Sequence, residues 1–114
     1  MVLTLISVGA IILASISGFV GMTRFDAIVR FEYEYFREEW KRDGCPSGYF
    51  WMPEAQHFRV NASGSRLAMR LLRHAPSWIA GTGVEPTLRS FRRVSLVFLV
   101  SLMLGLMTLL SKAI

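Results

Sequence analysis

The chain has 114 residues, of which 53% are hydrophobic, and a formal net charge of +5 from thirteen Lys and Arg against eight Asp and Glu. This length argues against several domains. In a soluble protein the positive charge would suggest a nucleic-acid partner, but here the apolar residues gather at both ends and the charges in the middle, which points to an anionic lipid surface instead.

The first apolar run, Met1–Met22, contains no charged side chain. A secretory signal would carry a basic segment ahead of ~7–15 apolar residues and a small-residue cleavage site after them. This run is longer, and no basic side chain stands in front of it. We therefore expect an uncleaved transmembrane helix.

The second apolar run, Val94–Ser111, has neither a charged residue nor a proline. At ~1.5 Å per residue a helix of this length spans ~27 Å, close to the hydrocarbon thickness of a bilayer. Its backbone groups bond within the helix, so lipid can surround it. The sequence thus predicts an all-α membrane protein, with two transmembrane helices in a hairpin joined by a helical cytoplasmic loop region.

Small residues recur at four-residue spacing in both runs, and such residues let helices approach closely in lipid. They are Ala10, Ala14 and Gly18 on one face of the first run, Ser17 and Gly21 beside them, and Ser101 and Gly105 in the second run. We expect a helix-packing seam, within one hairpin or between two copies. The alternative is that Gly, Ala and Ser are simply common in membrane helices.

Basic residues set the predicted orientation, because cationic loops stay on the cytoplasmic side. Twelve of the thirteen Lys and Arg lie between the two runs. We therefore place this loop in the cytoplasm and both termini outside. The arginines nearest the spans are expected to contact anionic headgroups; they are Arg24, Arg89, Arg92 and Arg93.

The segment Thr23–Asp43 is predicted to continue the first span as an amphipathic cytoplasmic helix, because its apolar residues recur at three- and four-residue steps. The stripe consists of Phe25, Val29, Tyr33, Phe36 and Trp40. It can lie on headgroups, pack against the rest of the loop or bind a partner. We favour packing within this chain or its own dimer, and the stripe is also the candidate partner face.

Opposite charges four residues apart would support this helix by a few tenths of a kcal/mol each. The pairs are Asp26 with Arg30, Arg30 with Glu34, and Glu38 with Arg42. Since Glu34, Glu38 and Glu39 all have basic neighbours, we interpret them as a solvated face and not as acid–base groups.

The region 44–93 is predicted to be a cytoplasmic loop with short helices. Gly44, Pro46 and Gly48 end the preceding helix. The large apolar residues 49–52 then fit neither a helical stripe nor an alternating strand. Two interpretations stay open: contact with the membrane–water boundary, or a plug against the helices of the loop.

Two further helical segments are expected in this loop. Ser65–His74 combines leucines with three arginines, a pattern typical of a basic amphipathic helix on a membrane surface. Pro76 ends it. Glu85 and Pro86 begin a helix that runs into the second span, because proline is tolerated in a first turn.

No group of residues suggests catalysis. His57, His74 and Cys45 match no zinc-binding spacing, and the chain has no phosphate-binding or nucleophile motif. Neither apolar run contains the ionisable residue that usually marks an ion path. We predict no catalytic residue, no metal, no cofactor and no nucleic-acid partner.

Two short motifs carry a family resemblance: Gly48-Tyr49-Phe50, and Arg89-x-x-Arg92-Arg93 leading into the last apolar run. With spans at both ends and a basic loop between them, the chain resembles the universal stress protein B family of small bacterial inner-membrane proteins. It departs from that family after the aromatic pair, where Ser65–His74 and a Trp-Ile-Ala-Gly-Thr-Gly insertion replace a region rich in tyrosine and histidine. The resemblance implies an inner-membrane protein linked to stress survival, with no catalytic residues.

The function expected from the sequence is association with protein or lipid, as a homodimer or as an accessory subunit of a larger membrane complex. The alternative is a membrane-perturbing holin- or toxin-like protein, since two short spans and a basic segment suit that class too. A membrane enzyme is the least supported class, because no activated pair of residues is present.

Overall fold

The computed structural model describes residues 1–52, 62–79 and 82–113. Within them the chain is all helical and has no strand. The elements are α1 (Val2–Tyr35), α2 (Arg37–Arg42), α3 (Ala62–Arg73), the short 3₁₀ helix η1 (Ser77–Ile79) and α4 (Glu85–Ala113).

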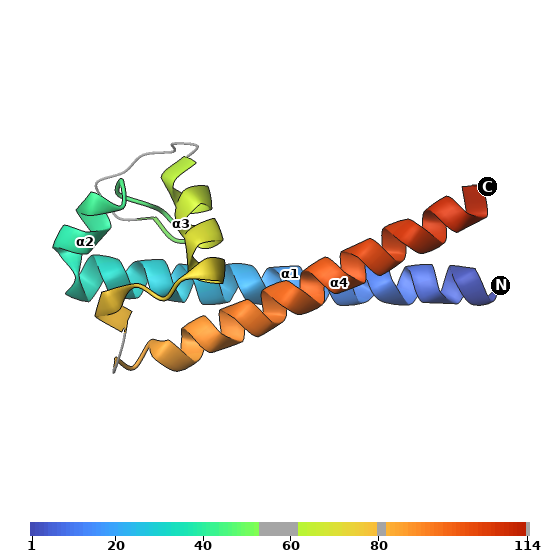
Figure 1. The fold of residues 1–114 in the computed structure, drawn as a ribbon, viewed down its shortest axis with the longest axis horizontal. Helices are drawn as coiled ribbons and strands as arrows, with labels where there is room; N and C mark the ends of the chain where they lie inside the picture. Colours follow the sequence, from blue (N-terminus) through green and yellow to red (C-terminus); the bar gives the residue numbers. More distant parts are fainter. Residues whose placement is uncertain (53–61, 80–81, 114) are drawn as a thin grey trace.

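Two long helices, α1 and α4, give the molecule its length of 53 Å. Both are long and apolar enough to cross a membrane. The two chain termini lie at one end of this pair, and α2, α3 and η1 gather at the other end (Figure 1). We call this second end the head: residues 24–52, 62–79 and 82–93.

The helix predicted over Thr23–Asp43 is divided in the structure. The helix α1 runs without interruption into the head, but it ends at Tyr35, and Phe36 has a non-helical backbone with φ −132° and ψ 56°. The short helix α2 then turns back, which brings the Trp40 ring to 4.8 Å from the ring of Tyr33. An edge-to-face contact across this break replaces the single straight stripe that the sequence predicts.

The head has its own apolar core, to which all of its long elements contribute. The buried members are Phe25, Ile28, Val29, Trp40, Leu67, Leu71, Ile79, Val84, Leu88 and Phe91. The helix predicted over Ser65–His74 is confirmed as α3, which starts three residues earlier. Leu67 and Leu71, four residues apart, are buried in this core, whereas the arginines of α3 are exposed.

The predicted start of the last helix at Glu85 is confirmed, with Pro86 in its first turn. From there α4 runs through the arginines of the head into the second apolar run without a break. Both long helices therefore belong partly to the head and partly to the apolar pair.

Candidate functional site

The small residues of the two apolar runs lie at the contact between α1 and α4. Ala10, Ala14, Ser101 and Gly105 are buried there. A Cβ atom on Gly18 would come within 3.1 Å of the Phe98 ring, and one on Gly105 within 3.6 Å of Ala10. The structure thus brings all five predicted packing residues into one seam within the chain, as expected where small side chains allow close backbone approach.

A polar contact closes the same seam near the chain termini. The hydroxyl oxygens of Ser7 and Thr108 are 2.7 Å apart, and both residues are buried. This pair was not predicted from the sequence. The signal was available, because Ser7 lies three residues before Ala10 and Thr108 three residues after Gly105, on the same helical faces.

Outside the seam, the two helices present large apolar side chains to their surroundings. Only 22% of the most apolar stretch of α1 and 17% of that of α4 are buried. The exposed side chains include Leu5, Ile12, Ile16, Phe19, Leu96, Val100, Met103, Met107 and Leu110. We call this surface the apolar belt.

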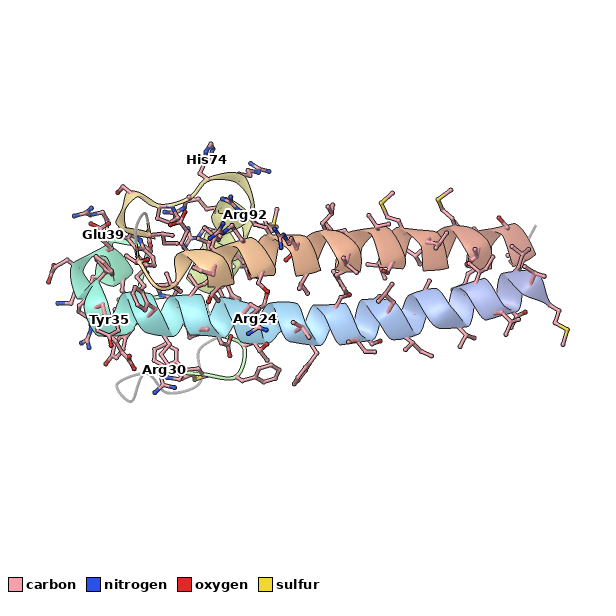
Figure 2. The ribbon with its side chains drawn as sticks, turned by 90° about the horizontal axis from the view of Figure 1, so that it is seen from below. Arg24, Arg30, Tyr35, Glu39, His74 and Arg92 are labelled. Carbon is pink, nitrogen blue, oxygen red and sulfur yellow. The ribbon has the colours of Figure 1, made fainter. Side chains whose placement is uncertain are left out.

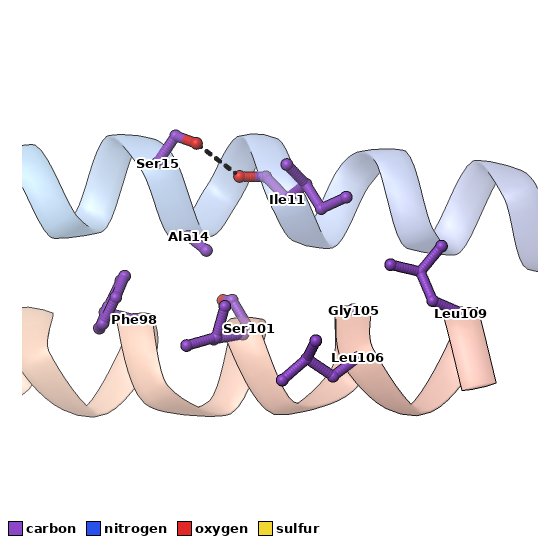
Figure 3. Close-up of a pocket in the computed structure, with 9 residues that line it drawn as sticks. Ile11, Ala14, Ser15, Phe98, Ser101, Gly105, Leu106 and Leu109 are labelled. Atoms are coloured by element: carbon purple, nitrogen blue, oxygen red, sulfur yellow. Dashed lines mark hydrogen bonds between the residues drawn. The ribbon is translucent and has the colours of Figure 1, made fainter.

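One side of the seam opens into an apolar groove of about 270 Å³ (Figure 3). Its lining combines large apolar side chains with small residues from both helices, and the small residues are Ala14, Ser15, Ser101 and Gly105. The Ser15 hydroxyl donates a hydrogen bond to the carbonyl oxygen of Ile11, at 2.9 Å, so it is satisfied within its own helix. The surface of the groove is therefore apolar, and the Ser15 hydroxyl does not need a further hydrogen-bond acceptor there.

The four arginines assigned to headgroups all lie in the head, but they have different surroundings. Arg24, Arg89 and Arg93 are exposed. Arg92 turns inward: its Nε donates to the carbonyl oxygen of Leu71 at 2.8 Å, and its Nη2 is buried. Arg92 therefore ties α4 to the last turn of α3, where a cation also favours the negative end of the helix dipole.

The stripe assigned as a partner face packs largely inside the chain. Phe25, Val29 and Trp40 are buried, whereas Tyr33 and Phe36 are half-buried. The Trp40 indole N–H donates to the carbonyl oxygen of Pro46 at 2.8 Å. The contacts made by the buried members are those of a folding core, which is the intrachain packing favoured in the sequence analysis.

Glu32 is a buried carboxyl group in this core, and the sequence analysis did not single it out. Within the described residues, neither of its carboxylate oxygens accepts a hydrogen bond. Burial raises the pKa of this carboxyl from 4.5 to about 9, Asp43 and Glu39 reinforce the shift, and Arg70 opposes it. At neutral pH Glu32 is therefore a neutral acid, able to donate a hydrogen bond to Asp43.

Asp43 in turn accepts a 2.8 Å hydrogen bond from Nη1 of Arg70. Asp43, which follows the end of α2, therefore binds Arg70 of α3 and also lies near enough to Glu32 of α1 to raise its pKa. Glu32 lies seven residues after Phe25 and four after Ile28, so its helical position placed it on the buried face. This spacing was the signal that could have identified it.

Asp26 holds the loop that follows α2. Its carboxylate accepts hydrogen bonds from the backbone N–H groups of Tyr49, Phe50 and Trp51, at 2.6, 2.8 and 3.1 Å. Asp26 was predicted to pair with Arg30, but its carboxylate is directed at the loop. Three aligned backbone donors satisfy a buried carboxylate better than one flexible, solvated cation does.

The carboxylates of Glu34, Glu38 and Glu39 each pair with a basic side chain. Glu34 pairs with Arg30 at 3.0 Å, as predicted. Arg42 was predicted to pair with Glu38 but binds Glu39 at 2.8 Å, since both carboxylate oxygens of Glu39 lie within reach of its guanidinium group.

Two other chemically reactive residues, His74 and Cys45, lie in the described part of the chain. His74 is exposed (Figure 2) and Cys45 is half-buried. His57 lies outside the described residues. In the part of the chain that the structure describes, no group of three or more His, Cys, Asp or Glu side chains is arranged to hold a metal ion.

No family model, no curated protein and no solved structure matches this chain. The likeness to the universal stress protein B family therefore rests on the sequence motifs described above.

Proposed function

We propose that this protein spans a membrane twice, with α1 and α4 forming a hairpin, and that it acts through association of its head with protein or lipid. The observation that carries the proposal is the apolar belt. A core helix of a soluble protein would be mostly buried, whereas about four fifths of each apolar stretch here faces outward. In water such a surface would drive aggregation, whereas in the hydrocarbon of a bilayer it can contact lipid chains.

The distribution of charge supports a cytoplasmic head. Arg24, Arg89 and Arg93 are exposed, and each lies within five residues of an apolar run. At this level they can contact anionic headgroups, each contributing about 1 kcal/mol to binding of the surface. The positive-inside rule then places both termini outside. The family resemblance adds two parts to this proposal: a location in a bacterial inner membrane and a role in stress tolerance.

Association, and not catalysis, is the mode of action that the polar groups favour. The apolar runs contain no ionisable side chain, which argues against an ion path. Glu32, the described carboxyl whose pKa is raised, lies inside a packed core and is out of reach of a substrate. The groove beside the seam suits a further helix, because its small side chains permit close approach. A second copy of this chain, or another membrane subunit, can supply that helix.

Reporters fused to either terminus, together with carbonate extraction, test this proposal. We expect the protein to stay in carbonate-washed membranes and both termini to report an external location. Crosslinking in native membranes should then give a discrete dimer or complex band. Release by carbonate, or a cytoplasmic location of either terminus, would overturn the proposed topology. A rapid loss of membrane potential on expression would favour the holin- or toxin-like alternative.

A further inference from the structure

Residues 44–52, which follow α2, include aromatic side chains that stay largely exposed. Tyr49 is 55% exposed, with one edge-to-face contact at 5.5 Å to the ring of Phe25, and Phe50 is 63% exposed. Trp51, in contrast, turns inward, with its ring 5.4 Å from that of Tyr33. The loop therefore has an inner side that packs and an outer side that presents two aromatic rings.

The outer side continues the apolar belt. The ring of Phe50 lies 5.7 Å from the ring of Phe19, and Phe19 is an exposed member of that belt. Figure 2 shows the segment after α2 lying beside α1 close to Arg24. The Phe50 ring thus connects the head to the apolar part of α1, at the level of the first exposed arginine of the head.

Asp26 fixes this loop in a form suited to an apolar environment. A loop normally needs water for its backbone N–H groups, and an unsatisfied group in hydrocarbon costs several kcal/mol. Here three successive N–H groups donate to one carboxylate. Gly48 allows the close approach, because a side chain there would collide with the Asp26 carboxylate. These donors therefore do not need water.

We propose that residues 48–52 form a membrane-seated wedge: the rings of Tyr49 and Phe50 enter the boundary between headgroups and acyl chains, and Asp26 clamps the wedge to α1. The inference rests on the proposed two-span topology and adds a lipid-contacting site to it. Its partner is the interfacial layer of the same bilayer, because Phe50 contacts Phe19 of the apolar belt and the segment is bound by Asp26, which lies two residues after the exposed Arg24. Tyrosine is enriched at this depth, where its ring is buried and its hydroxyl stays wet.

Depth-dependent quenching tests the wedge in the full-length chain. Three single cysteines replace exposed residues in a Cys45→Ser background: Phe50→Cys in the loop, Leu13→Cys in the span and Tyr35→Cys at the far end of α1. Each carries the same environment-sensitive fluorophore, in vesicles of phosphatidylcholine and phosphatidylglycerol containing lipids spin-labelled at shallow or deep positions. We expect shallow quenching at Phe50→Cys to exceed that at Tyr35→Cys severalfold, and deep quenching to be strongest at Leu13→Cys.

The quenching results distinguish a failure of the wedge proposal from a failure of the proposed two-span topology. Quenching at Leu13→Cys together with no more quenching at Phe50→Cys than at Tyr35→Cys would overturn the wedge and leave the spans in place. No quenching at Leu13→Cys would overturn the proposed topology, and the wedge with it.

The clamp has its own test, with the label kept at Phe50→Cys. We expect Asp26→Asn and Gly48→Ala each to reduce shallow quenching at least twofold, because each disturbs the carboxylate that holds the loop. Deep quenching at Leu13→Cys should not change, which checks that the variants still insert. Glu34→Gln, which neutralises an exposed carboxylate of the same helix, is the matched control. Unchanged shallow quenching in both Asp26→Asn and Gly48→Ala would show that Asp26 does not hold the wedge.

Discussion

Glu32 links the stability of the head to pH, because its pKa is raised from 4.5 to about 9 in the fold. Between these two values the folded head holds a proton that the unfolded chain has released. Stability therefore falls as pH rises through this window. The contribution of the neutral acid is complete below pH 4.5 and is lost as the pH passes about 9.

We predict that Glu32→Gln stabilises the head at pH 8 by ~1–3 kcal/mol and flattens the dependence of its stability on pH between 5 and 9. Glutamine imitates the neutral acid, so the variant folds without taking up a proton. All three tryptophans lie in the head. Thermal unfolding in detergent micelles, followed by tryptophan fluorescence at several pH values, measures the effect.

Glu34→Gln is the control for this prediction, since Glu34 is exposed and only pairs with Arg30. Its loss should change stability by less than ~0.5 kcal/mol. If Glu32→Gln melted at a lower temperature than the wild type at pH 8, the buried neutral acid would be the wrong description of Glu32.

At the scale of elements, the seam between α1 and α4 depends on the absence of side-chain volume. A Cβ atom on Gly105 would already touch Ala10 at 3.6 Å and Ile11 at 3.7 Å, whereas one on Gly9 would meet no atom within 4 Å. A leucine at Gly105 should therefore force the helices apart, and the same substitution at Gly9 should not.

We predict that Gly105→Leu weakens the seam by ~1–3 kcal/mol, the usual cost of overpacking. A cysteine pair, Ser7→Cys with Thr108→Cys, reports on it in a Cys45→Ser background, because the wild-type hydroxyls are 2.7 Å apart. Disulfide formation in membranes should slow by roughly tenfold in Gly105→Leu and stay unchanged in Gly9→Leu. Equal rates in the two variants would contradict close packing at Gly105.

The elements that the sequence could predict are those with a local signal. Absence of charge marks both apolar stretches, and four-residue spacing marks their small faces; α3 and the start of α4 were found in the same way. The structure of the head was harder to predict from the sequence, because its polar contacts join segments that are distant along the chain. Asp26 looked like a partner for Arg30, four residues away, yet it binds backbone groups more than twenty residues further on. The helix break at Phe36 also lacks a glycine or proline that would announce it.

At the scale of the whole molecule, one continuous face of α1 serves both the seam and the core of the head. The buried residues on that face recur at steps of three and four; they are Ser7, Ala10, Ala14, Ser17, Gly21, Phe25, Ile28 and Glu32. The same helix thus packs along α4 in the apolar pair and then shares the core of the head with α2, α3 and α4. Rotation of either half of α1 about its axis must therefore disturb the other half.

One inserted residue tests this coupling. An alanine added after Thr23 rotates the two halves of α1 by ~100° relative to each other, since the helix has ~3.6 residues per turn. The seam and the core of the head can then no longer both face their partners. We predict that the insertion either slows the Ser7→Cys to Thr108→Cys disulfide roughly tenfold or lowers the stability of the head by at least ~3 kcal/mol, the range for disrupted cores. Thr23→Ala adds the same side chain without the rotation and should change neither measurement. Retention of both properties in the insertion variant would show that the two halves of α1 adjust independently.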